Sequence, residues 1–87
     1  MKVVYTSEFT KNFYLLPANV QRLFRVQEKR FRENWRDPRL HSKKLEEDSI
    51  TFSFRITRTY RALFFFEDEK TAILATIGHR KDIYRKR

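Results

Sequence analysis

Three arginines stand close together in the second half of the sequence, at Arg55, Arg58 and Arg61. No acidic residue occurs between positions 50 and 66, so nothing within that stretch neutralises their charge. A guanidinium group stays ionised and can bind a phosphate through two parallel hydrogen bonds. We expect Arg55 and Arg61 to lie on adjacent antiparallel strands, where their side chains can hold one phosphate together.

The C-terminal stretch forms a second basic cluster with two groups that can move a proton or stack on a base, His79 and Tyr84. Its single acid is Asp82. The end of the last predicted strand can approach Arg55 and Arg61 across the sheet. The basic residues of this stretch are Arg80, Lys81, Arg85, Lys86 and Arg87.

These residue types are sufficient to cut RNA without a metal ion. The 2′-OH attacks the adjacent phosphorus, a base takes its proton, cations stabilise the developing negative charge, and an acid protonates the leaving 5′ oxygen. The sequence has no cysteine, and its acidic runs at 46–48 and 67–69 have no histidine at a ligand spacing. We therefore expect no metal site and no cofactor.

Each candidate also has an ordinary structural explanation. Arg61 lies in an otherwise apolar strand, where an unpaired charge costs free energy, and this favours a functional role. Arg58 falls in or beside the predicted hairpin turn, where a solvated charge is the simpler interpretation. A lone histidine such as His79 is more often structural than catalytic, and Tyr84 is equally suited to packing its ring on the core.

The overall charge indicates what kind of partner the surface binds. Twenty Lys and Arg residues against eleven Asp and Glu residues give a formal net charge of +9. An excess of this size indicates nucleic acid first and an anionic membrane surface second. No apolar run is long enough to span a bilayer, so we expect a cytoplasmic protein. The candidate RNA contacts are Lys43, Lys44, Arg58, Lys81, Arg85 and Lys86.

The hydrophobic periodicity defines the elements that must position these residues. Ser7 is a candidate N-cap for a first helix, Pro17 can begin a second, and Asp37-Pro38 ends it. Alternation with a period of two begins at Ile50 and indicates strands. The predicted elements are a strand at 2–6, helices at 7–16 and 17–35, a loop at 39–49, and strands at 50–56, 60–66 and 71–77.

This order predicts an α+β fold, β-α-α-β-β-β, in which two N-terminal helices pack on a small antiparallel sheet. The 87 residues are enough for one domain, which we expect to span positions 1–87. Aromatic residues make up 16% of the sequence and supply the large side chains that such a small core needs.

Three segments in this order resemble the RelE/ParE toxin superfamily. The first is a basic loop that ends in Lys43-Lys44-Leu45. The second, residues 54–64, reads FRITRTYRALF, and the third, residues 77–84, reads IGHRKDIY. They are similar to the family's lysine–leucine loop, its R-I-x-x-x-Y/H-R-x-x-F/Y hairpin and its G-H-R-x-x-Y ending. The resemblance covers essentially the whole chain and does not identify a subfamily.

The resemblance implies the toxin half of a type II toxin–antitoxin pair, with a cognate antitoxin as its protein partner. RelE-like members are mRNA interferases, hydrolases that cleave messenger RNA in the ribosomal A site and so inhibit translation. ParE-like members instead inhibit DNA gyrase on a nearly identical fold. A third possibility is an RNA-binding module or degenerate toxin without catalysis. The ribosome and mRNA are therefore expected partners, whereas a membrane is not.

The resemblance also implies roles for single residues. Arg61 matches the hairpin arginine that stabilises the phosphate, and Arg55 matches the cation of the preceding strand. His79 and Arg80 fall where members place an active-site histidine or arginine, and Tyr84 falls on the aromatic residue near the C-terminus. The chain departs from RelE itself, which has strand lysines where this chain has Ser53 and Arg55. The general base is therefore open, with His79 as the first candidate and Tyr84 as the second.

Overall fold

The computed structural model describes residues 1–45 and 50–83 of the chain. None of the helices within these residues is long and apolar enough to cross a membrane. In chain order the elements are β1 (Lys2–Tyr5), α1 (Ser7–Tyr14), α2 (Ala18–Glu33), the 3-10 helix η1 (Pro38–Leu40), β2 (Lys43–Lys44), β3 (Phe52–Arg55), β4 (Tyr60–Asp68), β5 (Thr71–His79) and α3 (Arg80–Ile83).

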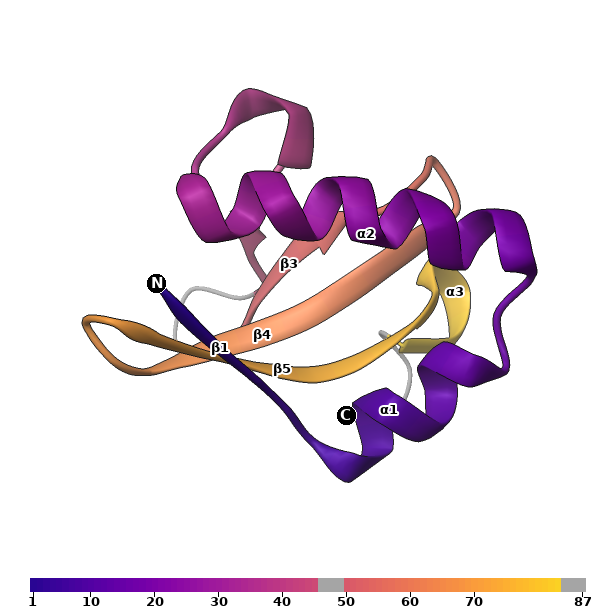
Figure 1. The fold of residues 1–87 in the computed structure, drawn as a ribbon, viewed down its shortest axis with the longest axis horizontal. Helices are drawn as coiled ribbons and strands as arrows, with labels where there is room; N and C mark the ends of the chain where they lie inside the picture. The colour runs from indigo at the N-terminus through magenta and orange to yellow at the C-terminus, as the bar shows by residue number, and fades with distance from the viewer. Residues whose placement is uncertain (46–49, 84–87) are drawn as a thin grey trace.

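The strands form one sheet in the order β1-β5-β4-β3-β2, and α1 and α2 pack against it (Figure 1). The expected α+β class and order of elements are confirmed. The neighbours from β5 to β2 pair antiparallel, but β1 pairs parallel to β5, with Lys2 beside Thr71 and Tyr5 beside Leu74. The direction of β1 is not set by a hairpin, because both helices and three strands separate it from its partner.

Two elements lie where the sequence predicted irregular chain. β2 falls within the predicted loop, where Lys43 pairs with Ser53 and Lys44 with Phe52. A strand of two residues is too short to show alternation. α3 is a single turn in the predicted tail, and the Arg80 N–H that begins it donates to the Thr59 carbonyl at 2.8 Å.

The caps explain where the two long helices begin and end. Thr6, not Ser7, is the N-cap of α1, because its Oγ1 accepts from the Phe9 N–H at 2.9 Å. The same hydroxyl donates to the Ala75 carbonyl at 2.7 Å, which ties the start of α1 to β5. α2 ends at Glu33 rather than at Trp35, since Asn34 already has an extended backbone with φ −164° and ψ 101°.

A cluster of aromatic rings fills the space between α2 and the sheet. The Phe31 ring centroid lies 4.7 Å from that of Phe54 and 4.7 Å from that of Phe64. Phe24 adds a further ring 6.4 Å from Phe54. All four side chains are fully buried. Rings at these separations contribute more than their buried area alone.

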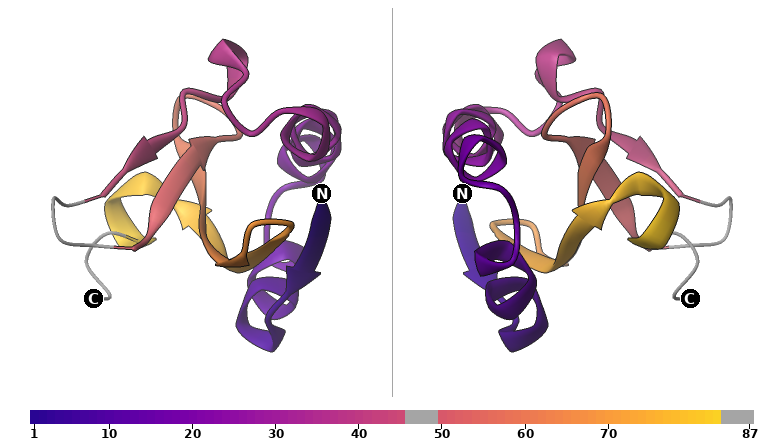
Figure 2. Two further views of the ribbon diagram at one scale, coloured as in Figure 1. Left: turned by 90° about the vertical axis from the view of Figure 1, so that its left-hand side faces the viewer. Right: turned by 90° about the vertical axis from the view of Figure 1, so that its right-hand side faces the viewer.

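The side chains of the central strands alternate between two different surroundings. Phe54 and Ala62 are register partners in the core beneath the helices. Ser53, Arg55 and Arg61 therefore lie on the opposite face, which we call the open face. α3 packs there, because a Cβ added at Gly78 would meet the Ile83 Cγ2 at 2.9 Å. Figure 2 shows α2 on one side of β3 and β4 and α3 on the other.

One buried charge on α2 leads to a pH prediction. Glu28 is 8% exposed, and burial raises its pKa above the ordinary value of 4.5 against the opposing attraction of Arg32. A raised pKa means that ionising Glu28 destabilises the fold, so this contribution to the free energy of unfolding is largest below pH 4.5 and falls as the pH rises through the folded-state pKa.

Glu28→Gln carries no such charge. We expect the stability of this variant relative to wild type to rise between about pH 4 and pH 7, as measured by urea unfolding at several pH values. The exposed Glu33→Gln on the same helix is the matched control. A relative stability that falls with pH would show that the ion pairs of Glu28 with Arg25 and Arg32 outweigh its burial.

Candidate nucleic-acid interface

Arg55 and Arg61 form the centre of the open face. They are direct register partners at the ends of β3 and β4 that meet the connecting turn. Directly opposed residues of antiparallel strands have their Cβ atoms about 4.5–5.5 Å apart, so the two guanidinium groups can reach the same anion. Both residues are half-buried.

Two polar atoms of this face have unmet hydrogen-bonding capacity. Within the described ranges, Ser53 Oγ and Arg55 Nε are buried and have no hydrogen-bond partner. An unsatisfied buried polar group costs about 1–3 kcal/mol, and most such groups in native proteins are paired. A hydroxyl and a guanidinium N–H are both donors to an anion. Both atoms lie beneath the surface of this face, since Ser53 is only 1% exposed, and they are two residues apart on one strand.

The hairpin turn fixes the position of Arg61. Its Nη1 donates to the carbonyls of Thr57 at 2.7 Å, Arg58 at 2.9 Å and Tyr60 at 3.2 Å. The turn itself is held by Thr57 Oγ1, which accepts from the N–H groups of Thr59 and Tyr60, each at 3.1 Å. A guanidinium anchored in this way loses little further side-chain entropy when it binds an anion.

Further cations surround this pair. Lys43 is exposed and shares a register position and a face with Ser53, while Lys44 on the next position is exposed beside Phe52. Arg58 is exposed in the turn. Arg80 and Lys81 are exposed on α3, whose Ile83 packs on the open face.

His79 lies on the other side of the sheet. It is the register partner of Tyr60, which packs against the core beneath the helices, and the two ring centroids are 5.7 Å apart. Its Nδ1 accepts from the Lys81 N–H at 3.1 Å, so the neutral ring carries its proton on Nε2. The structure therefore brings Arg55 and Arg61 together but does not place His79 beside them. Tyr84, Arg85 and Lys86 lie outside the described residues.

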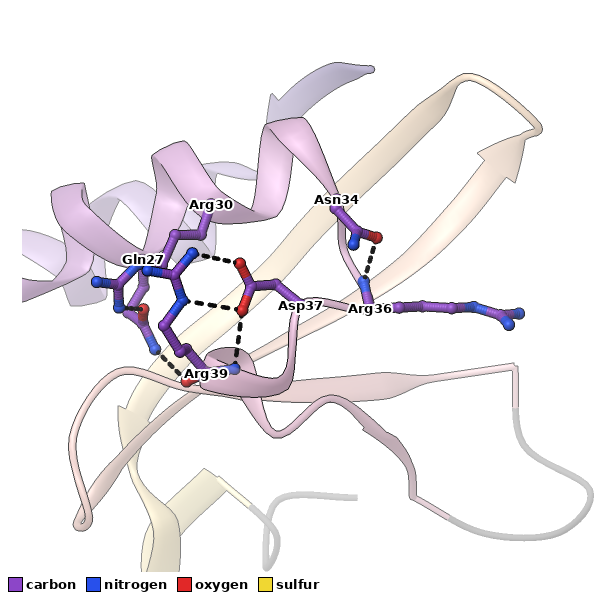
Figure 3. A network of polar contacts seen from close by, with 6 residues as sticks. All are labelled: Gln27, Arg30, Asn34, Arg36, Asp37 and Arg39. Atoms are coloured by element: carbon purple, nitrogen blue, oxygen red, sulfur yellow. Dashed lines mark hydrogen bonds and ion pairs between the residues drawn. The ribbon is translucent and has the colours of Figure 1, made fainter.

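A buried glutamine that the sequence pattern did not single out holds the Arg55 backbone in place. Gln27 on α2 is 6% exposed, and its Nε2 donates to the carbonyls of Arg39 at 3.0 Å and Arg55 at 2.7 Å. Its Oε1 accepts from Arg30 Nη1 at 2.8 Å. Figure 3 shows Gln27 between Arg30 and the η1 segment. In the sequence, Gln27 occupies one position of the apolar stripe of α2. A polar residue in that stripe is the one sign in the sequence that Gln27 has a structural role.

Replacing Gln27 by leucine leaves the Arg39 and Arg55 carbonyls without their side-chain donor. We expect a loss of about 1–3 kcal/mol in the free energy of unfolding, measured by urea denaturation. Gln21→Leu is the matched control, since Gln21 donates to the Leu16 carbonyl alone, at 3.0 Å. An equal loss of unfolding free energy in both variants would show that the hydrogen bond from Gln27 to the Arg55 carbonyl stabilises the fold no more than an ordinary side-chain hydrogen bond does.

The chemistry available on the open face is electrostatic. Arg55 and Arg61, with the exposed Lys43 on the neighbouring strand, can bind a phosphate and stabilise added negative charge on it. Across residues 1–45 and 50–83, no group of three or more His, Cys, Asp or Glu side chains could hold a metal ion. The arrangement suits a phosphodiester ligand.

Solved structures share this fold, although no protein-family model and no curated protein sequence matches the chain. The RelB–RelE antitoxin–toxin complex from Methanococcus jannaschii matches with a TM-score of 0.77 and 19% identity, over 97% of this chain and 98% of that one. YafQ from E. coli matches with a TM-score of 0.78 and 9% identity, over 95% and 97% of the two chains.

A third structure is also similar in sequence. The toxin–antitoxin complex RelBE2 from Mycobacterium tuberculosis matches with 30% identity and a TM-score of 0.65. The match covers 91% of this chain and 96% of that one. The similarity therefore spans both chains almost completely.

Proposed function

Since the chain belongs to the RelE/ParE toxin superfamily, we propose that it is the toxin of a toxin–antitoxin pair and a metal-independent endoribonuclease that cleaves ribosome-bound messenger RNA. The observation that carries the nuclease proposal is the Arg55–Arg61 pair on the open face of the sheet. The net charge of +9 supports a polyanionic substrate. The reaction would take place in the cytoplasm, where ribosomes are.

In the proposed reaction, the scissile phosphate binds to Arg55 and Arg61. The 2′-OH attacks the adjacent phosphorus while its proton leaves to a base, and the bond to the 5′ oxygen breaks as that oxygen gains a proton. The products are a 2′,3′-cyclic phosphate and a 5′-OH. The arginines stabilise the extra negative charge of the pentacoordinate transition state, and Arg80 on α3 is the third cation that we assign to this role.

The position of His79 leads to a prediction about proton transfer. In this conformation the register of β4 and β5 places its ring on the face of the sheet opposite Arg55 and Arg61. We expect His79→Gln to retain cleavage to within about tenfold, whereas loss of a general base lowers the rate by about 10²- to 10⁴-fold. Single-turnover cleavage of ribosome-bound messenger measures this. A loss of the larger size would place His79 in the reaction, and Tyr84→Phe tests the second candidate.

The proposed protein partner is an antitoxin. The similar structures from M. tuberculosis and M. jannaschii are toxin–antitoxin complexes. We propose that a short acidic or amphipathic antitoxin segment covers this chain and neutralises its basic site. A peptide of this antitoxin segment should bind the protein with nanomolar affinity and so raise its melting temperature. An unchanged melting temperature would count against the proposal.

The test of the nuclease proposal is a purified translation system with a defined messenger, in which primer extension maps any cut. Cleavage that requires ribosomes is the expected result, and a ribosome-free reaction is the control. An intact messenger would overturn the nuclease proposal. A supercoiling assay with DNA gyrase would then examine the ParE-like alternative.

A further inference from the structure

A hollow of about 340 Å³ lies at the edge of the sheet, away from the Arg55–Arg61 pair. It lies between the end of α2, η1 and β2. We call it the edge hollow and define it by Trp35, Arg36, Asp37, His41, Lys43 and Lys44. Nothing in the proposed reaction uses Trp35, Arg36 or His41.

The edge hollow contains an exposed, planar cation supported by a fixed ring. The Arg36 guanidinium carbon lies 4.9 Å from the centroid of the Trp35 ring. That ring is held in turn by Phe52 and Phe66, whose centroids are 5.3 and 5.1 Å from it. Arg36 itself is exposed. A guanidinium plane is a surface on which an unpaired nucleobase stacks.

The loop that borders the edge hollow is held in an unusual conformation. His41 has φ 49° and ψ 45°, the one non-glycine residue with positive φ among those the structure describes. Ser42 Oγ donates to the Trp35 carbonyl at 2.7 Å, and the His41 N–H donates to the Pro38 carbonyl at 3.2 Å. Such backbone conformations cost free energy and occur often at ligand sites.

The charge of the edge hollow is positive. Its one acid, Asp37, is already paired with Arg39, which donates to it from Nη2 at 2.7 Å, from Nε at 3.0 Å and from the backbone N–H at 2.9 Å (Figure 3). Among the described residues that line the hollow, Arg36, Lys43 and Lys44 therefore have no acid left to balance them. Since Lys43 is also the register partner of Ser53, this charge continues onto the open face.

We propose that the edge hollow is a nucleotide subsite for single-stranded RNA, in which a base stacks on Arg36 and its phosphate binds Lys43 and Lys44. The proposal deepens the proposed function, on which it rests for the class of its ligand. The RNA strand would pass from this subsite across the exposed Lys43 to the Arg55–Arg61 pair. The subsite would fix the strand relative to the bond that is cut.

The test is fluorescence anisotropy with a labelled single-stranded RNA of about ten nucleotides. We expect Arg36→Ala to weaken binding by about 5- to 150-fold, the range for losing one stacked base. Arg36→Lys should weaken it almost as much, because lysine keeps the charge but has no plane. Arg22→Ala, which removes an exposed arginine of α2, is the matched control and should have a much smaller effect. The bases of a duplex of the same sequence are not free to stack on Arg36. The affinity for this duplex should therefore be the same in the Arg36 variants as in Arg22→Ala.

The outcomes separate this proposal from the nuclease proposal. If the wild type does not cleave but the Arg36 variants still lose RNA affinity beyond Arg22→Ala, the subsite stands and the nuclease proposal fails. If the wild type cleaves and the Arg36 variants bind like Arg22→Ala, the subsite is wrong and the nuclease proposal stands. Binding retained by Arg36→Lys but lost by Arg36→Ala would reduce the site to a charge contact and overturn the stacking.

Discussion

Replacing Arg61 by alanine is expected to lower the rate of messenger cleavage by about 10²- to 10³-fold, as the loss of one preorganised donor to a developing negative charge does in other enzymes. Three backbone carbonyls at the turn hold the guanidinium, so its side-chain entropy is already lost on folding rather than on binding RNA. RNA affinity should fall far less than the rate. The measurement is single-turnover cleavage on ribosomes together with RNA binding.

Two further variants show whether the loss comes from the chemistry. Arg61→Lys keeps the charge but not the paired donors, and we expect an intermediate rate. Arg22→Ala removes an exposed charge from α2 and should leave the rate unchanged. The turn survives in Arg61→Ala because Thr57 Oγ1 still holds Thr59 and Tyr60, and a thermal melt verifies this. Retained RNA binding without cleavage would exclude a purely binding protein, whereas undiminished cleavage would remove Arg61 from the mechanism.

The largest expected effect on stability comes from Phe31→Ala. The Phe31 side chain is fully buried and contacts the Phe54 and Phe64 rings, which belong to the two strands that carry the arginine pair. Removing a buried phenylalanine ring costs about 3–5 kcal/mol, out of roughly 5–15 kcal/mol for a typical domain. We expect the melting temperature to fall by at least about 12 °C.

Leu15→Ala is the matched control, because Leu15 is 76% exposed at the end of α1. Its effect should stay within about 0.5 kcal/mol. Urea unfolding followed by tryptophan fluorescence measures both variants through Trp35. A cost below about 1.5 kcal/mol for Phe31→Ala would mean that the surrounding rings close the cavity, so that Phe31 is not central to the core.

The helices and the three long strands could be predicted because each buries one periodic face. Phe24 and Phe31 repeat with the helical period, and Phe52 and Phe54 with the strand period. The boundaries depended on long-range contacts that no local pattern contains. Thr6 caps α1 because β5 brings the Ala75 carbonyl beside it. β2 forms because β3 offers a free edge to Lys43 and Lys44.

The candidate site was predictable to the extent that strand alternation determines it. Pairing of β3 with β4 sets Arg55 opposite Arg61, and an arginine in an apolar strand is conspicuous. The side of the sheet on which His79 lies was not predictable, because it follows from the register Tyr60–His79. Gln27 was missed as a link to Arg55 because a glutamine within an apolar stripe shows nothing about the carbonyls that it meets.

The parallel pairing of β1 with β5 has a consequence for how the chain folds during its own synthesis. Lys2 pairs with Thr71, so this edge of the sheet forms only after the ribosome has added about 70 further residues. At a synthesis rate of about 5–20 residues per second, this interval lasts roughly 3–14 s. During that time Phe9 and Phe13 have no β5 to pack on, and long-range contacts of this kind slow folding. A nascent chain thus exposes aromatic surface to chaperones before it becomes a finished protein.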